Sequence, residues 1–241
     1  MEIKETDVKK RFTVILVNPK HAENIGLVAR SMKNTGFEHL SIVGLKAFRE
    51  KTMATAVHAI NILDNARFYP DVSKACADFN LIFGATAKPR KNFSIVSLKQ
   101  AVDIMFDYPP STKIGLLFGT ERTGLTSEEM RYSNFRFTIP QALKQPSYNL
   151  ASAVLLTLFQ IYSCSIHPES REKREEPLSW EEQDKCIRLI LEKLEDKKFI
   201  HTKNKKHMTQ TVYDLFGRLS MTSRDRNLLL AIFSKGPDNL F

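Results

Sequence analysis

The stretch FTVILVNPKHAENIGLVARSMKN, residues 12–34, decides the fold of this chain. It opens with the strand-like run FTVILV, which Pro19 ends because proline cannot donate a hydrogen bond to a β-ladder. Over residues 24–34, apolar side chains recur at helical spacing on one face, and Arg30 lies on the more polar side. The stretch therefore predicts a strand, a loop and a helix, with Asn24 as the helix N-cap.

The residues that follow predict a parallel sheet. Gly36 suits the C-cap of this helix, and the apolar run of residues 40–43 comes soon after it, as in a βαβ unit. Strands and helices continue to alternate along the chain, so we expect an α/β fold in which helices cover both faces of a parallel sheet.

A second strand-like run, residues 114–118, is followed by GTERTGLTSEEM. Gly119 and Gly124 enclose Glu121 and Arg122 in this segment, and such a turn can bring backbone N–H groups close to a ligand. The segment is not a phosphate-binding P-loop, because leucine rather than lysine follows Gly124. The alternative interpretation is a plain turn with two exposed charges.

A third run, residues 135–139, breaks at Pro140 and leads through a loop with Ser147 and Asn149 into a helical stretch over residues 150–162. Residues 148–166 carry no charge, which raises the possibility of a membrane span, but several polar side chains interrupt them. We therefore expect a buried helix. The alternative role of Ser147 and Asn149 is only to cap it.

The composition favours a nucleic-acid partner, although weakly. The chain has 241 residues, with 36 Lys and Arg against 27 Asp and Glu, which gives a net charge of +9. Cys76, Cys164 and Cys186 form no C-x-x-C pair, so neither a zinc site, nor any other metal site, nor a disulfide framework is indicated. The charged N-terminal residues precede a strand without an apolar leader, so we expect a cytoplasmic protein.

The charge pattern predicts two folded parts. Residues 1–166 form the larger one, and the charged, proline-containing residues 167–178 indicate a linker. Residues 179–241 contain three helical patterns, the first opened by a capping box of Ser179 and Glu182 and the third by Ser223 as a possible cap. We expect a small three-helix unit.

Between the first two of these helices lies HTKNKKH, residues 201–207. Its cations Lys203, Lys205 and Lys206 could contact RNA phosphates, which bind clustered cations through counterion release. The alternative is a solvated loop. The two histidines have no nearby carboxylate or cysteine in the sequence, so a metal site is rejected here too.

Three segments, NIGLVARSMKNTG, FGTERTGL and IPQALKQPSYNLASAV, resemble the three motifs of the SpoU/TrmH family of RNA ribose 2′-O-methyltransferases, in the family's order. The loop GATAKPRKN, residues 84–92, and the helical extension are similar to the TrmJ branch. Two positions depart from the family pattern: Tyr148 replaces the usual leucine between the motif Ser and Asn, and Lys88-Pro89-Arg90 varies the loop.

The resemblance implies a SPOUT-type α/β knot that binds S-adenosylmethionine and acts on RNA as a homodimer. It implies tRNA as the substrate, at anticodon-loop nucleotide thirty-two, with ribosomal RNA as one alternative. A non-catalytic RNA-binding relative is the other. The joint presence of Asn24, Arg30, Ser147 and Asn149 weighs against this last alternative.

The resemblance also implies roles for particular residues. The family is often described with this arginine as the general base, but a guanidinium holds its proton strongly, so we expect Arg30 to stabilise the developing alkoxide instead. Asn24 would orient Arg30 or the ribose, Glu121 would fix the loop geometry, and Ser147 and Asn149 would serve the cofactor and the nucleotide. The implied cofactor-binding residues are Ala85, Thr86, Gly119, Glu121, Gly124, Ile139, Ser147 and Leu150, and the implied RNA-binding residues are Arg30, Arg90, Arg122, Lys203, Lys205 and Lys206.

Overall fold

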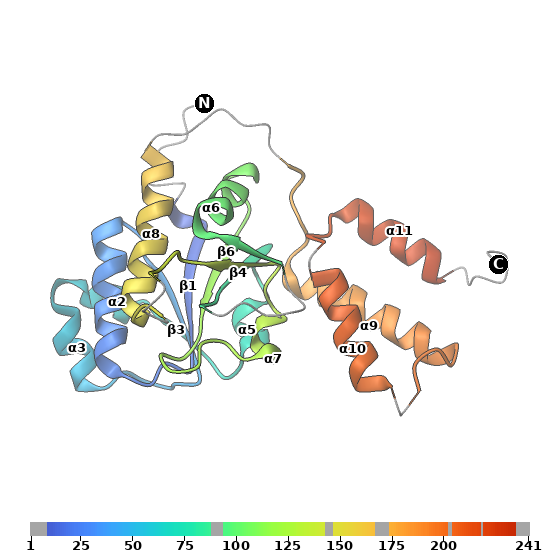
Figure 1. Cartoon of the computed structure of the whole chain (residues 1–241), viewed down its shortest axis with the longest axis horizontal. Coiled ribbons are helices and arrows are strands. Elements are labelled where there is room, and N and C mark those ends of the chain that lie inside the picture. Colours follow the sequence, from blue (N-terminus) through green and yellow to red (C-terminus); the bar gives the residue numbers. More distant parts are fainter. Residues whose placement is uncertain are drawn as a thin grey trace.

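A seven-stranded sheet forms the centre of the molecule (Figure 1). The protein is described by a computed structural model that covers residues 9–87, 94–142, 147–166, 174–201, 204–217 and 219–234. The strands are β1 (Phe12–Val17), β2 (His39–Val43), β3 (Arg67–Tyr69), β4 (Leu81–Ala85), β5 (Ile95–Ser97), β6 (Ile114–Phe118) and β7 (Phe135–Thr138).

Every pairing in this sheet is parallel, and the strand order is β3-β2-β1-β6-β4-β7-β5. The predicted parallel sheet is therefore confirmed. The last strand in the chain, β7, lies inside the sheet between β4 and β5, which both precede it in sequence. This insertion places the carboxyl ends of β4, β6 and β7 next to one another.

Helices cover both faces of the sheet, as predicted (Figure 1). Side chains along β1 alternate between the two faces, since Val14 and Leu16 pack in one core cluster while Ile15 and Val17 pack in the other. The helices of the larger part are α2 (Ala22–Thr35), α3 (Glu50–Ala56), η1 (Val57–Ala59), α4 (Ile60–Asp64), α5 (Val72–Cys76), α6 (Leu98–Asp107), α7 (Ser127–Met130) and α8 (Leu150–Ile166).

The start of α2 differs from the sequence prediction. Asn24 lies inside the helix, and the N-cap is His21, whose side chain makes no capping hydrogen bond. The carboxylate of Glu121 accepts hydrogen bonds from the backbone N–H groups of Lys20 and His21, and so it fixes the path by which the chain enters the helix. At the other end, Gly36 is the C-cap as predicted, with a left-handed φ of 77°.

Helix α8 is buried on one face only, so the expectation of a buried helix is half right. Val154, Leu158 and Ile161 are fully buried, whereas 56% of Phe159 is exposed to solvent. This uneven exposure leaves an apolar strip on the outer face. Among the residues that the structure describes, no helix has the length and apolar character to cross a membrane.

The three predicted C-terminal helices are present: α9 (Trp180–Asp196), α10 (Lys205–Gly217) and α11 (Ser223–Ser234). The capping box of Ser179 and Glu182 at the start of α9 is confirmed. The prediction of Ser223 as a cap is wrong by one residue, because the Oγ1 of Thr222 accepts from the backbone N–H of Asp225 at 3.4 Å.

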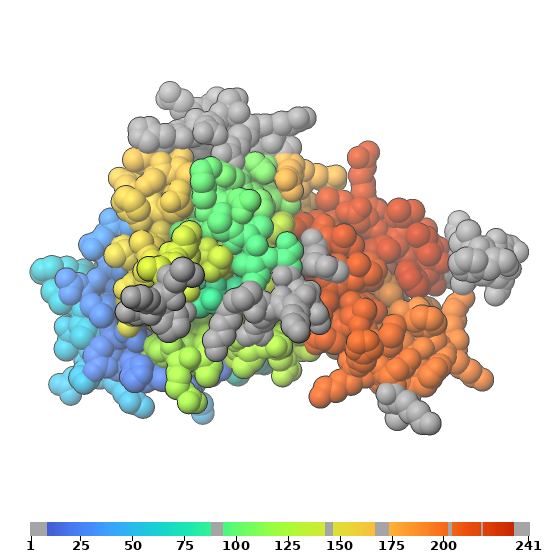
Figure 2. All heavy atoms as spheres, in the orientation of Figure 1, coloured from blue at the N-terminus to red at the C-terminus, as the bar shows by residue number. Residues whose placement is uncertain are grey.

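These helices lie directly against the larger part of the molecule, and the two are in contact in Figure 2. The Trp180 N–H donates to the carbonyl of Phe79 at 2.7 Å, and the Trp180 ring lies 4.7 Å from the Tyr132 ring. Further along, the Nδ2 of Asn134 donates to the carbonyl of Gly217 at 3.1 Å. Both α9 and α10 are thus fixed to the end of the sheet.

A polar cluster supports this docking. The Tyr213 hydroxyl donates to Asp184 at 2.6 Å, and Arg188 pairs with the same carboxylate at 2.6 Å. Burial and the bond to Asp184 raise the pKa of Tyr213. The guanidinium of Arg131, one residue after α7, lies 5.5 Å from the centre of the Tyr213 ring.

The segment predicted to be a linker is held in place over its described residues, 174–178. The Arg174 N–H donates to the carbonyl of Asp107 at 2.8 Å, and the Leu178 N–H donates to the carbonyl of Met221 at 2.7 Å. Leu178 is buried among the C-terminal helices. The charged composition therefore predicts a loose segment, whereas residues 174–178 are hydrogen-bonded both to the larger part and to the C-terminal part. Residues 167–173 lie outside the described part.

Candidate active site

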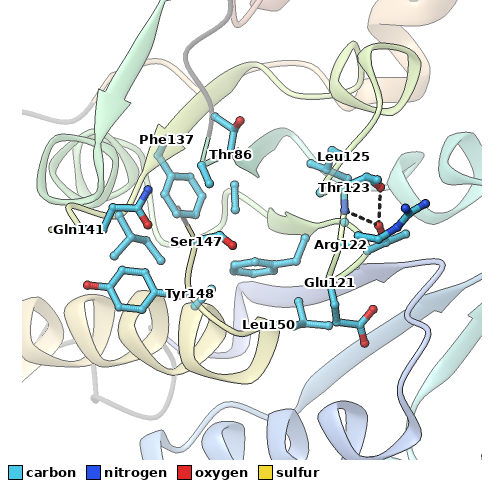
Figure 3. A pocket seen from close by; sticks show the side chains of 18 residues that line it. Thr86, Glu121, Arg122, Thr123, Leu125, Phe137, Gln141, Ser147, Tyr148 and Leu150 are labelled. Atoms are coloured by element: carbon cyan, nitrogen blue, oxygen red, sulfur yellow. Dashed lines mark hydrogen bonds between the residues drawn. The ribbon is translucent and has the colours of Figure 1, made fainter. Parts of the chain in front are cut away.

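A cavity of about 330 Å³ opens at the carboxyl ends of β4, β6 and β7 (Figure 3). Its walls come from three segments that are far apart in sequence, namely residues 85–87, residues 118–125 and side chains between 137 and 153. The volume falls at the lower end of the range of small-molecule sites, about 300–1,000 Å³. Ligands in open α/β sheets bind at this edge, where parallel strands end.

All of the side chains predicted to bind the cofactor line this cavity: Ala85, Thr86, Gly119, Glu121, Gly124, Ile139, Ser147 and Leu150. The sequence prediction missed Phe137 and Gln141, which also line it. Phe137 follows Phe135 by two residues on β7, so strand alternation predicts that both side chains lie on the same face of the sheet. Nothing in the sequence shows that this face meets a cavity.

The deep wall of the cavity is apolar. Phe118 and Phe137 are almost fully buried, and their rings meet edge to face with centroids 6.3 Å apart. Leu125 and Leu150 are buried beside them. A flat apolar or heteroaromatic group could pack against these side chains, while backbone groups of the surrounding turns remain available for polar contacts.

Both glycines of the 119–125 turn are required by its geometry. A Cβ on Gly119 would lie 2.2 Å from the carbonyl carbon of Gly124, so only glycine allows the two strands of the turn to approach. Gly124 has a φ of 65°, and its N–H donates to the carbonyl of Thr120 at 2.9 Å. The turn is therefore closed on itself and presents its backbone to the cavity.

Three predicted catalytic residues form one hydrogen-bonded chain. The Nδ2 of Asn24 donates to Glu121 at 3.0 Å, and the Oδ1 of Asn24 accepts from the Nδ2 of Asn149 at 3.0 Å. The Oδ1 of Asn149 in turn accepts from the N–H of Ala151 at 2.9 Å, which caps α8. Asn149 therefore does cap its helix, and it also links the three segments.

These hydrogen bonds favour the ionised form of the Glu121 carboxyl group. Partial burial alone would raise the pKa of this carboxyl group, but the hydrogen bonds from Asn24 and from the N–H groups of His21 and Lys20 outweigh that effect and lower the pKa. The carboxylate is thus ionised at neutral pH and accepts from all three donors. The predicted role of Glu121 in fixing the loop geometry has this structural basis.

Arg30 lies apart from this group. It is exposed on α2 and does not line the cavity. Six residues separate it from Asn24, which corresponds to about 9 Å along the helix axis and about 120° around it. The two side chains therefore leave α2 in different directions, and the expectation that Asn24 orients Arg30 has no support in the geometry of this chain alone.

The predicted RNA-binding residues are scattered. Arg122 is exposed and lines the cavity. Lys205 and Lys206 belong to the first turn of α10 rather than to a loop, and Lys205 forms an ion pair with Glu195 at 2.8 Å. Arg90 and Lys203 lie outside the described residues, as do Lys88 and Pro89.

The three cysteines do not form a site. Cys76 and Cys186 are buried and Cys164 is half-buried, and all three are free thiols. Burial raises the pKa of Cys76, so this thiol remains protonated and unreactive. Within the described ranges, no cluster of His, Cys, Asp or Glu side chains could hold a metal ion.

Comparison with protein families identifies a relationship over most of the larger part. Residues 11–159 match the model of the SpoU rRNA Methylase family. These residues include all three segments that form the cavity. The match therefore covers well over half of the chain, together with the candidate site.

Two curated relatives match almost the whole chain. The tRNA (cytidine-2′-O-)-methyltransferase TrmJ of Methanocaldococcus jannaschii is 32% identical over 228 residues, which cover 92% of this chain and 97% of the relative. The tRNA (cytidine/uridine/adenosine-2′-O-)-methyltransferase TrmJ of Pseudomonas aeruginosa is 27% identical over 239 residues, which cover 93% of each.

A solved structure shows the same architecture. The crystal structure of TrmJ from Z. mobilis ZM4 superposes on this chain with a TM-score of 0.81 at 26% identity. The superposition covers 92% of this chain and 97% of that one. It therefore includes the C-terminal helices as well as the sheet.

Proposed function

Because this chain belongs to the SpoU methylase family, we propose that it methylates a ribose 2′-hydroxyl of tRNA with S-adenosylmethionine as the methyl donor. The relatives that match it from end to end are named as tRNA 2′-O-methyltransferases, and this supports tRNA as the substrate. Within tRNA, we propose anticodon-loop nucleotide thirty-two as the target.

One observation carries the proposal: the three family motifs meet in space at a single cavity. Residues from the second and third motifs line its walls, and Asn24 of the first motif is bonded to Glu121 of the second and Asn149 of the third. These bonds join three segments of the chain at the mouth of one cavity, with Asn24 and Glu121 nearly 100 residues apart. Their convergence supports a ligand site.

The cavity suits S-adenosylmethionine. Its apolar wall of Phe118, Phe137 and Leu125 would hold the adenine ring, and the backbone of the turn at Gly119 would meet the polar groups. When bound, this cofactor supplies a methyl group on a positively charged sulfur. Glu121 contributes by keeping the loop in shape rather than by contacting the reacting atoms, because its carboxylate is already occupied by three donors.

The protein's part in the reaction is positioning and electrostatics. The chain would hold the ribose hydroxyl in line with the methyl group that the bound cofactor would supply, and the hydroxyl proton would pass to solvent as the new C–O bond forms. We assign Arg30 the task of stabilising negative charge on the ribose oxygen, since a guanidinium remains protonated at neutral pH. We assign to Ser147, which is exposed and lines the cavity, contact with the cofactor or the nucleotide.

The position of Arg30 supports a homodimer. Arg30 projects from α2 outside its own cavity, and the neighbouring surface is apolar, with Leu27 on α2 and Leu155 and Phe159 on α8 all exposed. A second copy that covers this surface would bury these side chains. Its cavity could then receive Arg30 from this copy.

The C-terminal helices would enlarge the RNA surface. Lys206 and the neighbouring His207 are exposed at the start of α10, and the helices are fixed to the larger part by Trp180 and Asn134. We propose that residues 179–241 form an accessory unit that holds the tRNA backbone. A fixed unit would present its cations at a constant distance from the cavity.

Two alternative functions, one enzymatic and one non-catalytic, are distinguished by experiment. Ribosomal RNA could be the substrate, since the matching family model is described for rRNA. A non-catalytic RNA binder could keep the same fold, although the intact chain of Asn24, Glu121 and Asn149 weighs against it. Activity on separate RNA pools distinguishes these alternatives.

The test is transfer of labelled methyl from S-adenosylmethionine to unmodified tRNA and, separately, to ribosomal RNA, followed by nuclease digestion and mass mapping. We expect label in one anticodon-loop ribose of tRNA. Label only in ribosomal RNA would change the substrate, and no label in either pool would favour the non-catalytic binder.

Variants of Arg30 test its role in the same assay. We expect Arg30→Ala to abolish transfer and Arg30→Lys to keep much of it, because the positive charge remains. Loss in both variants would indicate that the planar fork or proton transfer is essential. Lys33→Ala is the matched control, since it removes another exposed cation from the same helix.

A further inference from the structure

Tyr148 is the aromatic side chain at the rim of the cavity. It lies between Ser147, which lines the cavity, and Asn149, which is bonded to Asn24. About 40% of Tyr148 is exposed, whereas Phe118 and Phe137 of the same cavity are almost completely buried. Among the described residues at the rim, Tyr148 is therefore an aromatic ring that the protein's own packing leaves partly uncovered.

The ring is held in a defined position. Its hydroxyl donates to the carbonyl of Pro140 at 2.9 Å, so the side chain joins the two ends of the segment between β7 and α8. In Figure 3 the ring lies beside Gln141, across the cavity from Glu121 and Arg122. A fixed ring loses little conformational entropy when a second ring stacks on it.

We propose that Tyr148 is the stacking surface for the nucleobase whose ribose is methylated. This inference rests on the proposed function, because it needs an RNA nucleotide at the mouth of the cavity. Unpaired loop bases are recognised largely by stacking on aromatic side chains, and such stacking tolerates different bases.

The position of the ring favours the RNA base over the adenine of the cofactor. The buried side chains Phe118, Phe137 and Leu125 already provide an apolar wall for a flat group deep in the cavity. Tyr148 stands outside them, where a polynucleotide arriving from solvent would meet the protein. Gln141 and Arg122 then flank the mouth with polar groups that can contact base edges or phosphates.

Two variants separate stacking from the bracing of the loop. Tyr148→Phe keeps the ring and removes the bond to Pro140, whereas Tyr148→Leu removes the ring. We expect Tyr148→Leu to raise the KM for tRNA about tenfold, and Tyr148→Phe to change it by less than about threefold. The Kd for S-adenosylmethionine, measured by equilibrium dialysis, should stay unchanged in both.

A direct signal of stacking comes from an anticodon-stem-loop RNA with 2-aminopurine at the target position. Binding to the wild-type protein should quench its fluorescence, and binding to Tyr148→Leu should quench it much less. Phe68→Leu is the matched control, since it makes a similar change to a partly exposed ring on β3, at the far side of the sheet.

Several outcomes would overturn the proposal. A weaker Kd for S-adenosylmethionine in Tyr148→Leu, with the KM for tRNA unchanged, would assign the ring to the cofactor. Equal losses in Tyr148→Phe and Tyr148→Leu would show that the bond to Pro140 matters and not the ring. If the wild-type protein transfers no methyl group but quenches the probe through Tyr148, the proposed function fails while the stacking surface stands.

Discussion

At the scale of single residues, Glu121 has the most connections in the candidate site. Its carboxylate accepts from Lys20, His21 and Asn24, and it holds the residues at the entry to α2. Glu121→Gln would retain the shape of the side chain. Its NH2 group, however, would face hydrogen-bond donors that need an acceptor. We expect a loss of about 1–3 kcal/mol in the free energy of unfolding at neutral pH, measured by urea denaturation.

The lowered pKa of Glu121 fixes the pH dependence of that loss. A carboxyl group whose pKa is lower in the folded state stabilises the protein fully above its unfolded pKa, about 4.3. The contribution disappears as the pH falls through the lowered folded pKa. The difference between wild type and Glu121→Gln should therefore shrink in acid; a difference that grew there would contradict the assignment.

Val57 has a strained backbone conformation, which should lower the stability of the protein. It is the C-cap of α3 and the first residue of η1, with φ 53° and ψ −110°, a conformation that a β-branched residue avoids, and 46% of it is exposed. Val57→Gly should relieve this strain while losing little packing. We expect a gain of about 1 kcal/mol, seen as a higher Tm.

Val57→Ala is the control for this prediction. Alanine keeps a Cβ, so most of the backbone strain remains and the Tm should rise less than with glycine. If Val57→Gly lowered the Tm instead, the contacts of the valine side chain would outweigh its backbone strain.

At the scale of elements, the turn of residues 119–125 has no room for a side chain at Gly119. Gly119→Ala would push the backbone of Gly124 and Leu125 away, and the cavity wall would open. We expect binding of S-adenosylmethionine to weaken more than about tenfold in equilibrium dialysis, with a loss of about 1–3 kcal/mol in stability.

Gly36→Ala provides a comparison at a different kind of glycine. Gly36 has a positive φ, unlike Gly119, and a Cβ there would meet only the side chain of Lys9, at the C-cap of α2 and far from the turn. It should cost about 1 kcal/mol of stability without changing the affinity for S-adenosylmethionine. Equal losses of affinity in both variants would mean that general destabilisation, and not the turn, was being measured.

Most of these elements could be predicted from the sequence, because their signals are local. The apolar periodicity of α2, the Gly36 cap and the Ser179 capping box all depend on residues within a few positions of one another. The three motif segments were recognised in the same way. Their convergence on one cavity agrees with the resemblance, and periodicity alone would not have predicted it.

What the sequence could not show depends on residues far apart. Asn24 is a residue type that favours the N-cap, but it lies inside α2 and its side chain donates to Glu121, almost 100 positions later. Hydrophobicity predicts that all of α8 is buried, because it does not reveal which face has a neighbour. The composition of residues 174–178 indicates a loose segment, since their backbone partners cannot be seen in the sequence.

At the scale of the whole molecule, direct contacts join the C-terminal helices to the larger part, so we expect the chain to unfold as one cooperative unit. Trp180, the only tryptophan, lies at that junction against Tyr132. We expect unfolding in urea followed by Trp180 fluorescence to coincide with unfolding followed by far-UV circular dichroism.

Loss of the junction should separate the two parts. Trp180→Ala removes the ring contact with Tyr132, so α9 to α11 should become accessible to protease while the sheet persists. Trp180→Phe keeps an aromatic ring and should resist better. Two separate transitions in the wild-type protein would instead show that the helices are only tethered.

The insertion of β7 between β4 and β5 also sets an order of assembly. Because β5 pairs only with β7 among the described strands, it cannot join the sheet until β7 has been synthesised, so the sheet cannot be completed in the order of translation. The cavity walls near Phe137 and Leu150 exist only after that step. Cofactor binding therefore reports that folding of the sheet has finished, and a nascent chain shorter than about 150 residues has no site to fill.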